Sequence, residues 1–341
     1  MGYTITQESF ASLTSYWTDL RHNLRWESIF VLPKWLEVWW QAFGSGAELY
    51  LCAVWQREKI IGIAPLLVRD KTASIIGSAD VCDYLDFVVT PGMEGDFFTV
   101  LLDDLGQRGI NHLDLRSLRP DSAVLTDLLV IAQNRKYDVF CSLEDVSLEL
   151  DLLPTWDEYL ATLTGKQRHE VRRKLRRLWE AGDVDYHIVE DSAAVHDVMD
   201  TFLVLFSKSR KEKTTFMTAG MESFFRSLAD TMAEARLLRL GILELNRLPT
   251  AMVMCFDYND CVYLYNSGYD PHYSSLSVGL LSKVLCIKDS IHRGRKRFDF
   301  LKGGESYKYH LGGREIPLYS CQITIKSTRP RTSHCQSTLG G

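Results

Sequence analysis

The sequence contains no long apolar run. Every stretch of about 18 residues in the chain includes a charged side chain, whereas a helix that spans a bilayer needs about 20 predominantly apolar residues. The N-terminus also lacks the basic segment followed by an apolar one that marks a secretory signal. From these absences we expect that the chain does not span a membrane and is not secreted.

The cysteine spacing lacks any metal-binding or redox motif. None of the 8 cysteines belongs to a C-x-x-C pair, and most lie within apolar runs, as Cys255 does between Met252 and Phe256. Buried free thiols in a reducing compartment explain this pattern better than disulfides or zinc. We therefore expect free cysteines and a cytoplasmic location.

Positive charge is scarce in the first half. Residues 1–150 hold 12 Lys/Arg against 21 Asp/Glu, a charge of −9, and residues 151–341 hold 27 against 23, a charge of +4. The asymmetry favours an anionic ligand on the second half. The negative total of −5, without aromatic residues interleaved among the basic ones, argues against DNA binding.

The length of 341 residues exceeds the usual size of a single core and predicts two domains. Both halves show the same order of elements, namely helices, a meander of strands and a late strand-helix-strand unit. The expected boundary lies at 150–155, around Pro154. We expect domains at 1–150 and 151–326 and, from its low apolar content, a disordered tail at 327–341.

The stretch Tyr263–Lys308 is the most informative part of the chain, because it reads as strand, polar turn, helix, basic turn and strand. The apolar residues that follow the Ser-Val-Gly at 277–279 have the spacing of a helix with one apolar face. A helix that begins after small residues offers free N–H groups and a positive dipole end to a phosphate. An ordinary β-α-β unit without a ligand is equally consistent with the spacing.

Three stretches match the motifs of a known family. IGIAPL at 61–66, Gly77 and DYLDF at 83–87 match "G-x-x-PL … G … DY-x-D-F", and Arg168–Leu178 matches a basic helix. GYDP at 268–271, Ser277-x-Gly279 and FDFLKGGESYK at 298–308 match "GYDP … SPG … FDFLRGDE-x-YK". In these motifs the chain resembles the GNAT-related acyltransferases associated with bacterial cellulose and exopolysaccharide biosynthesis, distant relatives of the Fem-type aminoacyl transferases.

The resemblance implies two tandem GNAT-like α/β domains, each with a mixed, largely antiparallel sheet flanked by helices. The second domain would bind acyl-CoA and be catalytic, and the first would lie on the acceptor side without a cofactor. The sequence departs from the family at Val278, where proline is usual, and at Gly304, where aspartate is usual. The second departure removes a carboxylate, so no catalytic role is carried over to Gly304.

Acyl transfer needs a donor site, a base near the acceptor and hydrogen-bond donors for the oxyanion. The donor-site candidates are the helix start and one preceding tyrosine: Ser277, Val278, Gly279, Leu280 and Tyr265. Gly279 would let the backbone approach the pyrophosphate closely. A plain N-cap at Ser277 is the alternative interpretation.

Glu305 is the candidate base, because burial after the Gly-Gly turn would raise its pKa toward neutrality; an exposed turn glutamate is the alternative. Asp299 is either a second acid at the site or, slightly favoured, the ion-pair partner of a nearby Arg or Lys. Tyr307 and Lys308 are candidate donors to the thioester oxygen or the leaving thiolate.

The acceptor-binding candidates are Asp83, Tyr84, Asp270 and Arg172. Asp83 and Tyr84 would form a wall between the domains, although their segment also reads as a turn, as does Asp270-Pro271. Arg172 belongs to a helix with seven Lys/Arg in the twelve residues 166–177. Its basic face is either solvated or contacts a phosphate-bearing acceptor, the CoA 3′-phosphate or an anionic membrane surface.

We therefore expect a cytoplasmic acyltransferase that uses acetyl-CoA or another acyl-CoA and no metal. The acceptor would be a small molecule or a glycan- or lipid-linked intermediate, with peripheral contact to the inner face of the membrane or to a biosynthetic complex. Transfer would be direct, since no cysteine or serine has an activating partner nearby. The alternatives are a Fem-type transferase that uses aminoacyl-tRNA and a non-catalytic relative that binds glycans or a synthase complex.

Overall fold

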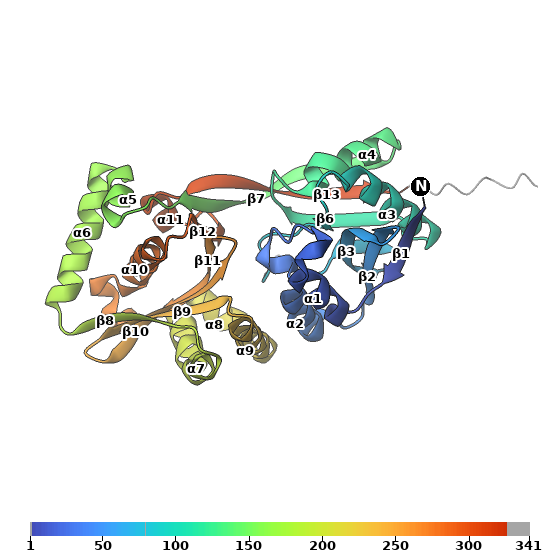
Figure 1. Cartoon of the computed structure of the whole chain (residues 1–341). Coiled ribbons are helices and arrows are strands. Elements are labelled where there is room, and N and C mark those ends of the chain that lie inside the picture. Colours follow the sequence, from blue (N-terminus) through green and yellow to red (C-terminus); the bar gives the residue numbers. More distant parts are fainter. Residues whose placement is uncertain (1, 79, 326–341) are drawn as a thin grey trace, which may run out of the picture.

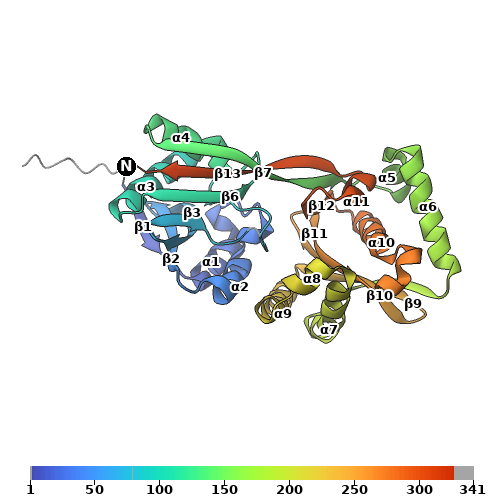
Figure 2. The same ribbon diagram turned by 180° about the vertical axis from the view of Figure 1, so that it is seen from behind.

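The computed structural model describes residues 2–78 and 80–325. Figures 1 and 2 show two lobes that are joined by a long ribbon of two strands. The tail expected at 327–341 lies outside the described residues.

The first half combines a strand meander with helices that cover it. Its helices and strands are β1 (Tyr3–Gln7), α1 (Phe10–Thr18), α2 (Pro33–Phe43), β2 (Glu48–Gln56), β3 (Lys59–Arg69), β4 (Thr72–Ile75), β5 (Val88–Val89), α3 (Glu94–Gln107), β6 (His112–Leu118), α4 (Leu129–Asn134) and β7 (Asp138–Asp151).

The second half repeats this arrangement with additional helices before its meander. Its elements are α5 (Trp156–Thr162), α6 (Gly165–Glu180), β8 (Val184–Val189), α7 (Ser192–Ser209), α8 (Lys211–Phe216), α9 (Ala219–Glu234), β9 (Leu238–Leu245), β10 (Leu248–Tyr258), β11 (Cys261–Tyr269), the 3-10 helix η4 (Pro271–Leu276), α10 (Val278–His292), β12 (Arg297–Lys302), α11 (Ser306–His310) and β13 (Arg314–Thr324).

Tight turns set both meanders. Two-residue turns join β3 to β4 at 70–71, β9 to β10 at 246–247 and β10 to β11 at 259–260. Both central residues of each turn have positive φ, a conformation that Asn and Asp adopt more readily than most residues and that matches the strand twist. After the turn at 246–247, Leu248 and Pro249 already belong to β10.

One sheet runs through the molecule in the order β1-β2-β3-β4-β6-β13-β7-β12-β11-β10-β9-β8, with β5 paired to β3. Its pairs are antiparallel except for β4 with β6 and β11 with β12, which are parallel. In each half a helix, α3 or α10, precedes the second strand of the parallel pair. The prediction of mixed, largely antiparallel sheet flanked by helices is confirmed.

The halves exchange their last strands. β13 pairs with β6 of the first half, and β7 pairs with β12 of the second. The two strands also pair with each other, from Arg314↔Glu149 to Thr324↔Asp138. They form the long ribbon in the centre of Figure 1. The expected boundary near 150 coincides with the end of β7, but the sheet continues across it, and the division into domains at 1–150 and 151–326 stays a prediction.

One expectation about the cysteines is wrong. Cys141 of β7 and Cys321 of β13 are directly paired in the ribbon and form a disulfide. They are 180 residues apart in sequence, so no local motif could show their pairing. The remaining described cysteines, Cys52, Cys82, Cys255, Cys261 and Cys286, are free and buried.

The sheet of the second half buries a different cluster on each face. Val262 and Phe298 pack with α10 on one face, whereas Tyr263 and Leu301 belong to the cluster that continues into the first half. This follows from the alternation of side chains along a strand. None of the helices in the described residues combines the length and apolarity that crossing a bilayer requires.

Candidate active site

Two parallel strands of the second half separate after a short paired segment. β11 and β12 pair only from Cys261↔Arg297 to Tyr263↔Asp299, although β11 continues to Tyr269 and β12 to Lys302. Beyond that point the facing backbone groups do not pair with each other. On β12 the Leu301 and Lys302 amides and carbonyls already have side-chain partners, so a polar chain of a ligand would pair with the facing groups of β11, because buried N–H and C=O groups need partners.

The point of separation is marked by an unusual backbone conformation. The pairing of β12 with β7 shifts between Asp299 and Leu301, and Leu301 has φ of 62°. Positive φ is unfavourable for a branched residue such as leucine and concentrates at functional sites. The Leu301 amide donates to Oδ1 of Asp299 at 2.7 Å, which holds the bulge in place.

Helix α10 begins on one face of the separated strands. Ser277, at the N-cap position, has a left-handed backbone conformation, and its side chain makes no capping hydrogen bond. The first turn of the helix carries no acidic residue. The first amides of a helix have no intrahelical acceptor. Among the predicted donor residues, the Ser277 amide donates to the Ser274 carbonyl and the Leu280 amide to the Ser277 carbonyl. The amides of Val278 and Gly279 are left at an uncapped helix start that suits an anion.

Gly279 has a packing role beside its predicted one. A Cβ atom at this position would lie 2.7 Å from the ring of Tyr269, so the missing side chain makes room for that ring. Whether the backbone also approaches a ligand at Gly279 stays a prediction.

Two lysines outside the predicted site residues, the buried Lys283 and the half-buried Lys213, lie near the start of α10. Nζ of Lys283 donates to the Gly279 carbonyl at 2.6 Å and lies 5.2 Å from the centre of the Tyr307 ring. Burial lowers the pKa of Lys283 to about 7, and the charges of Lys213 and Arg210 lower it further. Burial likewise lowers the pKa of Lys213, which donates to the Ser267 carbonyl, to about 8.

A signal for Lys283 is present in the sequence. The residue interrupts the apolar stretch Leu280–Ile287 on the core-facing side of the helix. A lysine is seldom fully buried unless it is paired or functional.

Lys308 holds the turn that follows β12. Its buried ammonium group donates to the carbonyl oxygens of Leu301 at 2.9 Å, Lys302 at 2.7 Å and Gly303 at 2.9 Å. It also lies 2.8 Å from Oε2 of Glu305. All three N–H donors of the lysine are therefore engaged within the turn.

Glu305 is half-exposed in this turn, with 45% of its side chain accessible. Burial acts to raise its pKa, but the hydrogen bond and the charge of Lys308 outweigh burial, and the pKa of Glu305 is lowered. The expectation of a raised pKa is wrong, because the ion pair was not visible in the sequence. A lowered pKa makes the carboxylate a weaker base at neutral pH.

Asp299 connects the two halves from the opposite face of the sheet. Its Oδ1 accepts hydrogen bonds from the Tyr84 hydroxyl at 2.8 Å and from the Leu301 amide. Burial and, next, the charge of Glu149 raise the pKa of Asp299 to about 7. The favoured ion pair with a nearby Arg or Lys does not form among the described residues, since Tyr84 takes that place.

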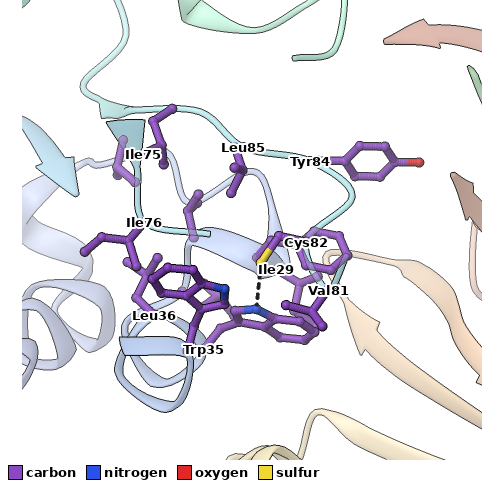
Figure 3. Packing of buried hydrophobic residues seen from close by; sticks show 14 of the residues in the cluster. Ile29, Trp35, Leu36, Ile75, Ile76, Val81, Cys82, Tyr84 and Leu85 are labelled. Carbon is purple, nitrogen blue, oxygen red and sulfur yellow. Dashed lines mark hydrogen bonds between the residues drawn. The ribbon is translucent and has the colours of Figure 1, made fainter. Parts of the chain in front are cut away.

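Tyr84 reaches Asp299 from the first half. Figure 3 shows its hydroxyl oxygen turned away from the apolar cluster in which Cys82 and Leu85 pack beside Trp35. The guanidinium group of Arg119 lies 5.0 Å from the centre of the Tyr84 ring. Tyr84 and Asp299 thus form a contact between the halves, and the acceptor-binding role of Tyr84 stays a prediction.

A pocket of about 310 Å³ lies between the halves beside this contact. Residues from both halves line it, among them Tyr84, Asp86, Arg119, Tyr263 and Asp299. Its volume falls at the lower end of about 300–1,000 Å³ that is usual for small-molecule sites. Asp86 accepts from the amides of Phe87 and Ala123, each at 2.8 Å, and burial raises its pKa to about 7.

The other predicted site residues lie apart from this pocket. Oδ2 of Asp83 accepts a long, 3.4 Å hydrogen bond from the Lys302 amide, and burial raises the Asp83 pKa. Asp270 caps η4 through the His272 amide and ring, which lower its pKa. Tyr265 is half-buried among aromatic rings, and its hydroxyl donates to the Val81 carbonyl at 3.2 Å.

The predicted basic helix is α6. Arg172 is exposed and makes no hydrogen bond or ion pair within residues 2–78 and 80–325, whereas Arg173 and Lys174 pair with Glu170. Arg177 donates to the Ser275 carbonyl at 3.4 Å, so α6 reaches the segment that leads into α10.

Comparison with known proteins agrees with this geometry. Residues 165–309 match the family model for an acetyltransferase (GNAT) domain, and no curated protein matches the chain in sequence. The solved structure of FemX is 12% identical, covers 93% of this chain and 96% of its own, and gives a TM-score of 0.65.

Two further solved structures share the fold. The C-terminal domain of a putative lysylphosphatidylglycerol synthetase from Agrobacterium fabrum is 11% identical over 93% of each chain, with a TM-score of 0.59. L-PGS from Bacillus licheniformis is 10% identical over 85% of this chain and 90% of its own, with a TM-score of 0.54. The chain therefore contains a GNAT acetyltransferase domain at residues 165–309, within a fold that it shares with FemX.

Proposed function

We propose that the protein is an acyltransferase that moves an acetyl or other acyl group from acyl-CoA to an amine or hydroxyl. The separation of β11 and β12 carries the proposal, because an uncapped helix start lies on one face of these strands and a pocket that includes Asp299 lies on the other. Donor and acceptor then meet between the strands.

The donor would bind with its pyrophosphate at the amides of Val278 and Gly279. The cationic groups of Lys283 and Lys213 lie beside this helix start, and Arg177 of α6 reaches the preceding segment. These charges suit an anion with several phosphates. The facing backbone edge of β11 would pair with the amide groups of the pantetheine arm.

In the proposed reaction the acceptor nitrogen or oxygen attacks the thioester carbonyl carbon, the C–S bond breaks and CoA leaves as a thiolate. We assign proton removal to Asp299 in place of Glu305, because a carboxylate with a pKa of about 7 is a suitable base at neutral pH. Backbone amides of β11 beyond Tyr263 would donate to the oxyanion.

The proposed reaction requires only an amine or a hydroxyl, so we take the class of acceptor from the family resemblance. An amine or hydroxyl of a sugar, peptide or lipid-linked intermediate in polysaccharide or cell-envelope biosynthesis fits a site between two lobes. The unpaired cationic groups of α6, Arg172 among them, would place the protein against an anionic membrane surface or a biosynthetic complex.

The proposal is tested by thermal shift and by a transfer assay with the full chain. Acetyl-CoA and CoA are expected to raise the unfolding temperature, and radiolabelled acetyl-CoA to label an acceptor from a panel of amines and alcohols. If no CoA species stabilises the protein, the donor assignment fails.

The exposed basic face of α6 also supports a second candidate, a transferase that takes its acyl group from aminoacyl-tRNA. A gel-shift titration with bulk tRNA separates the two candidates. Micromolar tRNA binding that Arg172→Glu abolishes, together with no response to CoA, would favour the tRNA-dependent reaction.

A further inference from the structure

Two free thiols meet beneath helix α10. Cys255 of β10 and Cys286 of α10 hold their sulfur atoms 3.5 Å apart, and both residues are buried, with 1% and 4% of their surface exposed. A disulfide bond is about 2.0 Å long, so a shift of about 1.5 Å would close the pair. The sulfur of Cys82, by contrast, lies 3.3 Å from the indole nitrogen of Trp35.

A buried hydroxyl without a partner lies near Cys286. The Tyr186 hydroxyl makes no hydrogen bond within the described residues, and it fills the space over Gly241, where a Cβ would be 2.2 Å from it. A buried hydroxyl without a partner is costly. An oxygen atom added to the Cys286 sulfur would give this hydroxyl a hydrogen-bond partner.

The two thiols differ in acidity. The hydrogen bond with Cys255 lowers the pKa of Cys286 against the effect of burial, and the charge of Arg239 lowers it further, whereas burial raises the pKa of Cys255. The thiolate is the form of cysteine that attacks an oxidant, and a second thiol nearby then resolves the product. Because both sulfurs are buried, the oxidant has to be small, and hydrogen peroxide meets this requirement.

The position of the pair connects it to the donor site. Cys286 follows Lys283 by one helical turn, and Nζ of Lys283 donates to the Gly279 carbonyl at the start of α10. On the sheet side, the register between β10 and β11 shifts between Met254 and Cys255. A bond between the two sulfurs would draw α10 toward β10 and move the helix start relative to β11.

We propose that Cys255 and Cys286 are an oxidisable pair that closes to a disulfide and thereby lowers the affinity of the α10 site for acyl-CoA. The pair itself goes beyond the proposed function, and its effect on the donor rests on that function.

The oxidation takes two steps. The Cys286 thiolate attacks one oxygen of hydrogen peroxide, the S–O bond forms, the O–O bond breaks, and the released hydroxide takes up the proton of the thiol as water. The Cys255 sulfur then attacks the sulfenic sulfur, the S–S bond forms, and the S–O bond breaks. The second water leaves with the Cys255 proton. The two thiols lose two electrons, and the peroxide gains them.

The test combines peptide mapping with a binding titration on the full chain. We expect hydrogen peroxide to produce, in the folded protein, a peptide that links Cys255 to Cys286 beside the Cys141–Cys321 peptide. Calorimetry should show acetyl-CoA affinity reduced about fivefold or more, a usual coupling between two sites, and restored by dithiothreitol. Because such coupling is reciprocal, saturating acetyl-CoA during oxidation should reduce the fraction of linked peptide.

Two variants and one control locate the effect. Cys286→Ala and Cys255→Ala should each make acetyl-CoA affinity insensitive to peroxide. Both variants keep the Cys141–Cys321 disulfide, so they also show whether dithiothreitol acts through the ribbon. Cys52→Ala removes a buried thiol of the first half and should respond to peroxide as the parent does.

The outcomes separate this inference from the proposed function. The inference is overturned if both thiols stay free after oxidation of the folded protein, or if Cys286 gains oxygen without a linked peptide. An unchanged acetyl-CoA affinity in the disulfide form, or an equal loss of affinity in Cys286→Ala, would also overturn it. A linked peptide together with no response to any CoA species in either redox state would support the pair and contradict the acyl-CoA donor.

Discussion

Each half contains a parallel strand pair with a helix between its two strands. Only in the second half do the residues around the start of that helix suit an anion. In the first half, α3 starts with Glu94 and Asp96 in its first turn. In the second half, α10 has no acidic residue in its first turn and is flanked by Lys283 and Lys213. Because a helix N-terminus attracts anions only when its first turn does not repel them, the comparison favours a donor in the second half alone.

The two units also differ in how their interiors are filled. In the first half, Phe97 of α3 is fully buried with Phe87 and Phe98, and a Cβ on Gly62 would lie 2.4 Å from the Phe97 ring. In the second half, the buried Lys283 and the half-buried Lys213 lie near the helix start. The region around α3 is thus packed as an apolar core, whereas the region around α10 retains polar groups that a ligand can contact.

The largest expected effect is on catalysis by Asp299→Asn. Removal of the base should lower kcat by about a hundredfold or more, the usual contribution of general base catalysis, while the KM for acyl-CoA stays within about twofold because Asp299 lies on the acceptor side. Initial rates at several pH values measure this. The parent rate should rise with pH through about 7, and the variant should lose that rise.

Asp86→Asn is the matched comparison in the first half. Both Asp86 oxygens accept backbone amides, and an asparagine amide group cannot replace the second acceptor. The variant should lose about 1–3 kcal/mol of unfolding free energy, with a smaller drop in kcat than Asp299→Asn. A larger drop in kcat for Asp86→Asn would reverse the assigned roles.

Lys283→Met should weaken acyl-CoA binding about tenfold or more, because it removes a cation beside the proposed pyrophosphate site. Lys288→Met on the same helix serves as the control, since Lys288 lies 6.0 Å from the centre of the Trp156 ring and away from the helix start. Calorimetric titration with acetyl-CoA measures both. Equal losses of acetyl-CoA affinity in the two variants would mean that Lys283 contributes only through its charge and not through its position at the helix start.

A pair of glycine substitutions tests the difference in packing. Gly62→Ala and Gly279→Ala each place a Cβ against a ring, and overpacking of this kind costs about 1–3 kcal/mol. Only Gly279→Ala should also weaken acetyl-CoA binding. Chemical denaturation gives the stability, and a loss of donor affinity in Gly62→Ala would contradict the comparison.

The last prediction concerns the pH dependence of stability. The pKa of Asp299 is raised to about 7 in the folded state, so its contribution to stability is present below the unfolded pKa, near 4, and is lost as pH rises toward 7. Asp299→Asn should therefore reduce the fall in unfolding free energy between pH 4 and 7 by at most about 1.4 kcal/mol per pH unit. Denaturation midpoints across this range check the sign.

The sequence predicted local features well and long-range contacts poorly. The motif at 298–308 and the small residues before Leu280 indicated the β-α-β unit and its helix start, because hydrophobic spacing and turn residues act locally. The exchange of β7 and β13 joins strands that are distant in the sequence. The Cys141–Cys321 disulfide joins residues 180 apart, and the Tyr84–Asp299 hydrogen bond joins residues 215 apart. No local pattern encodes such pairings.

The catalytic prediction failed for a related reason. Glu305 was expected to have a raised pKa from its position after two glycines, but the pKa depends on Lys308, whose side chain folds back onto the same turn. Lys283 could have been found, because a single lysine interrupts an otherwise apolar helix face. The charge of the pocket could not, since its acids come from both halves.

Hydrogen–deuterium exchange with and without acetyl-CoA tests most directly whether the second unit, and not the first, binds the donor. We expect slower exchange at 277–283 and at 300–305, with no change at 94–100 of α3. Protection at the start of α3, or no protection at the start of α10 under saturating acetyl-CoA, would contradict this expectation.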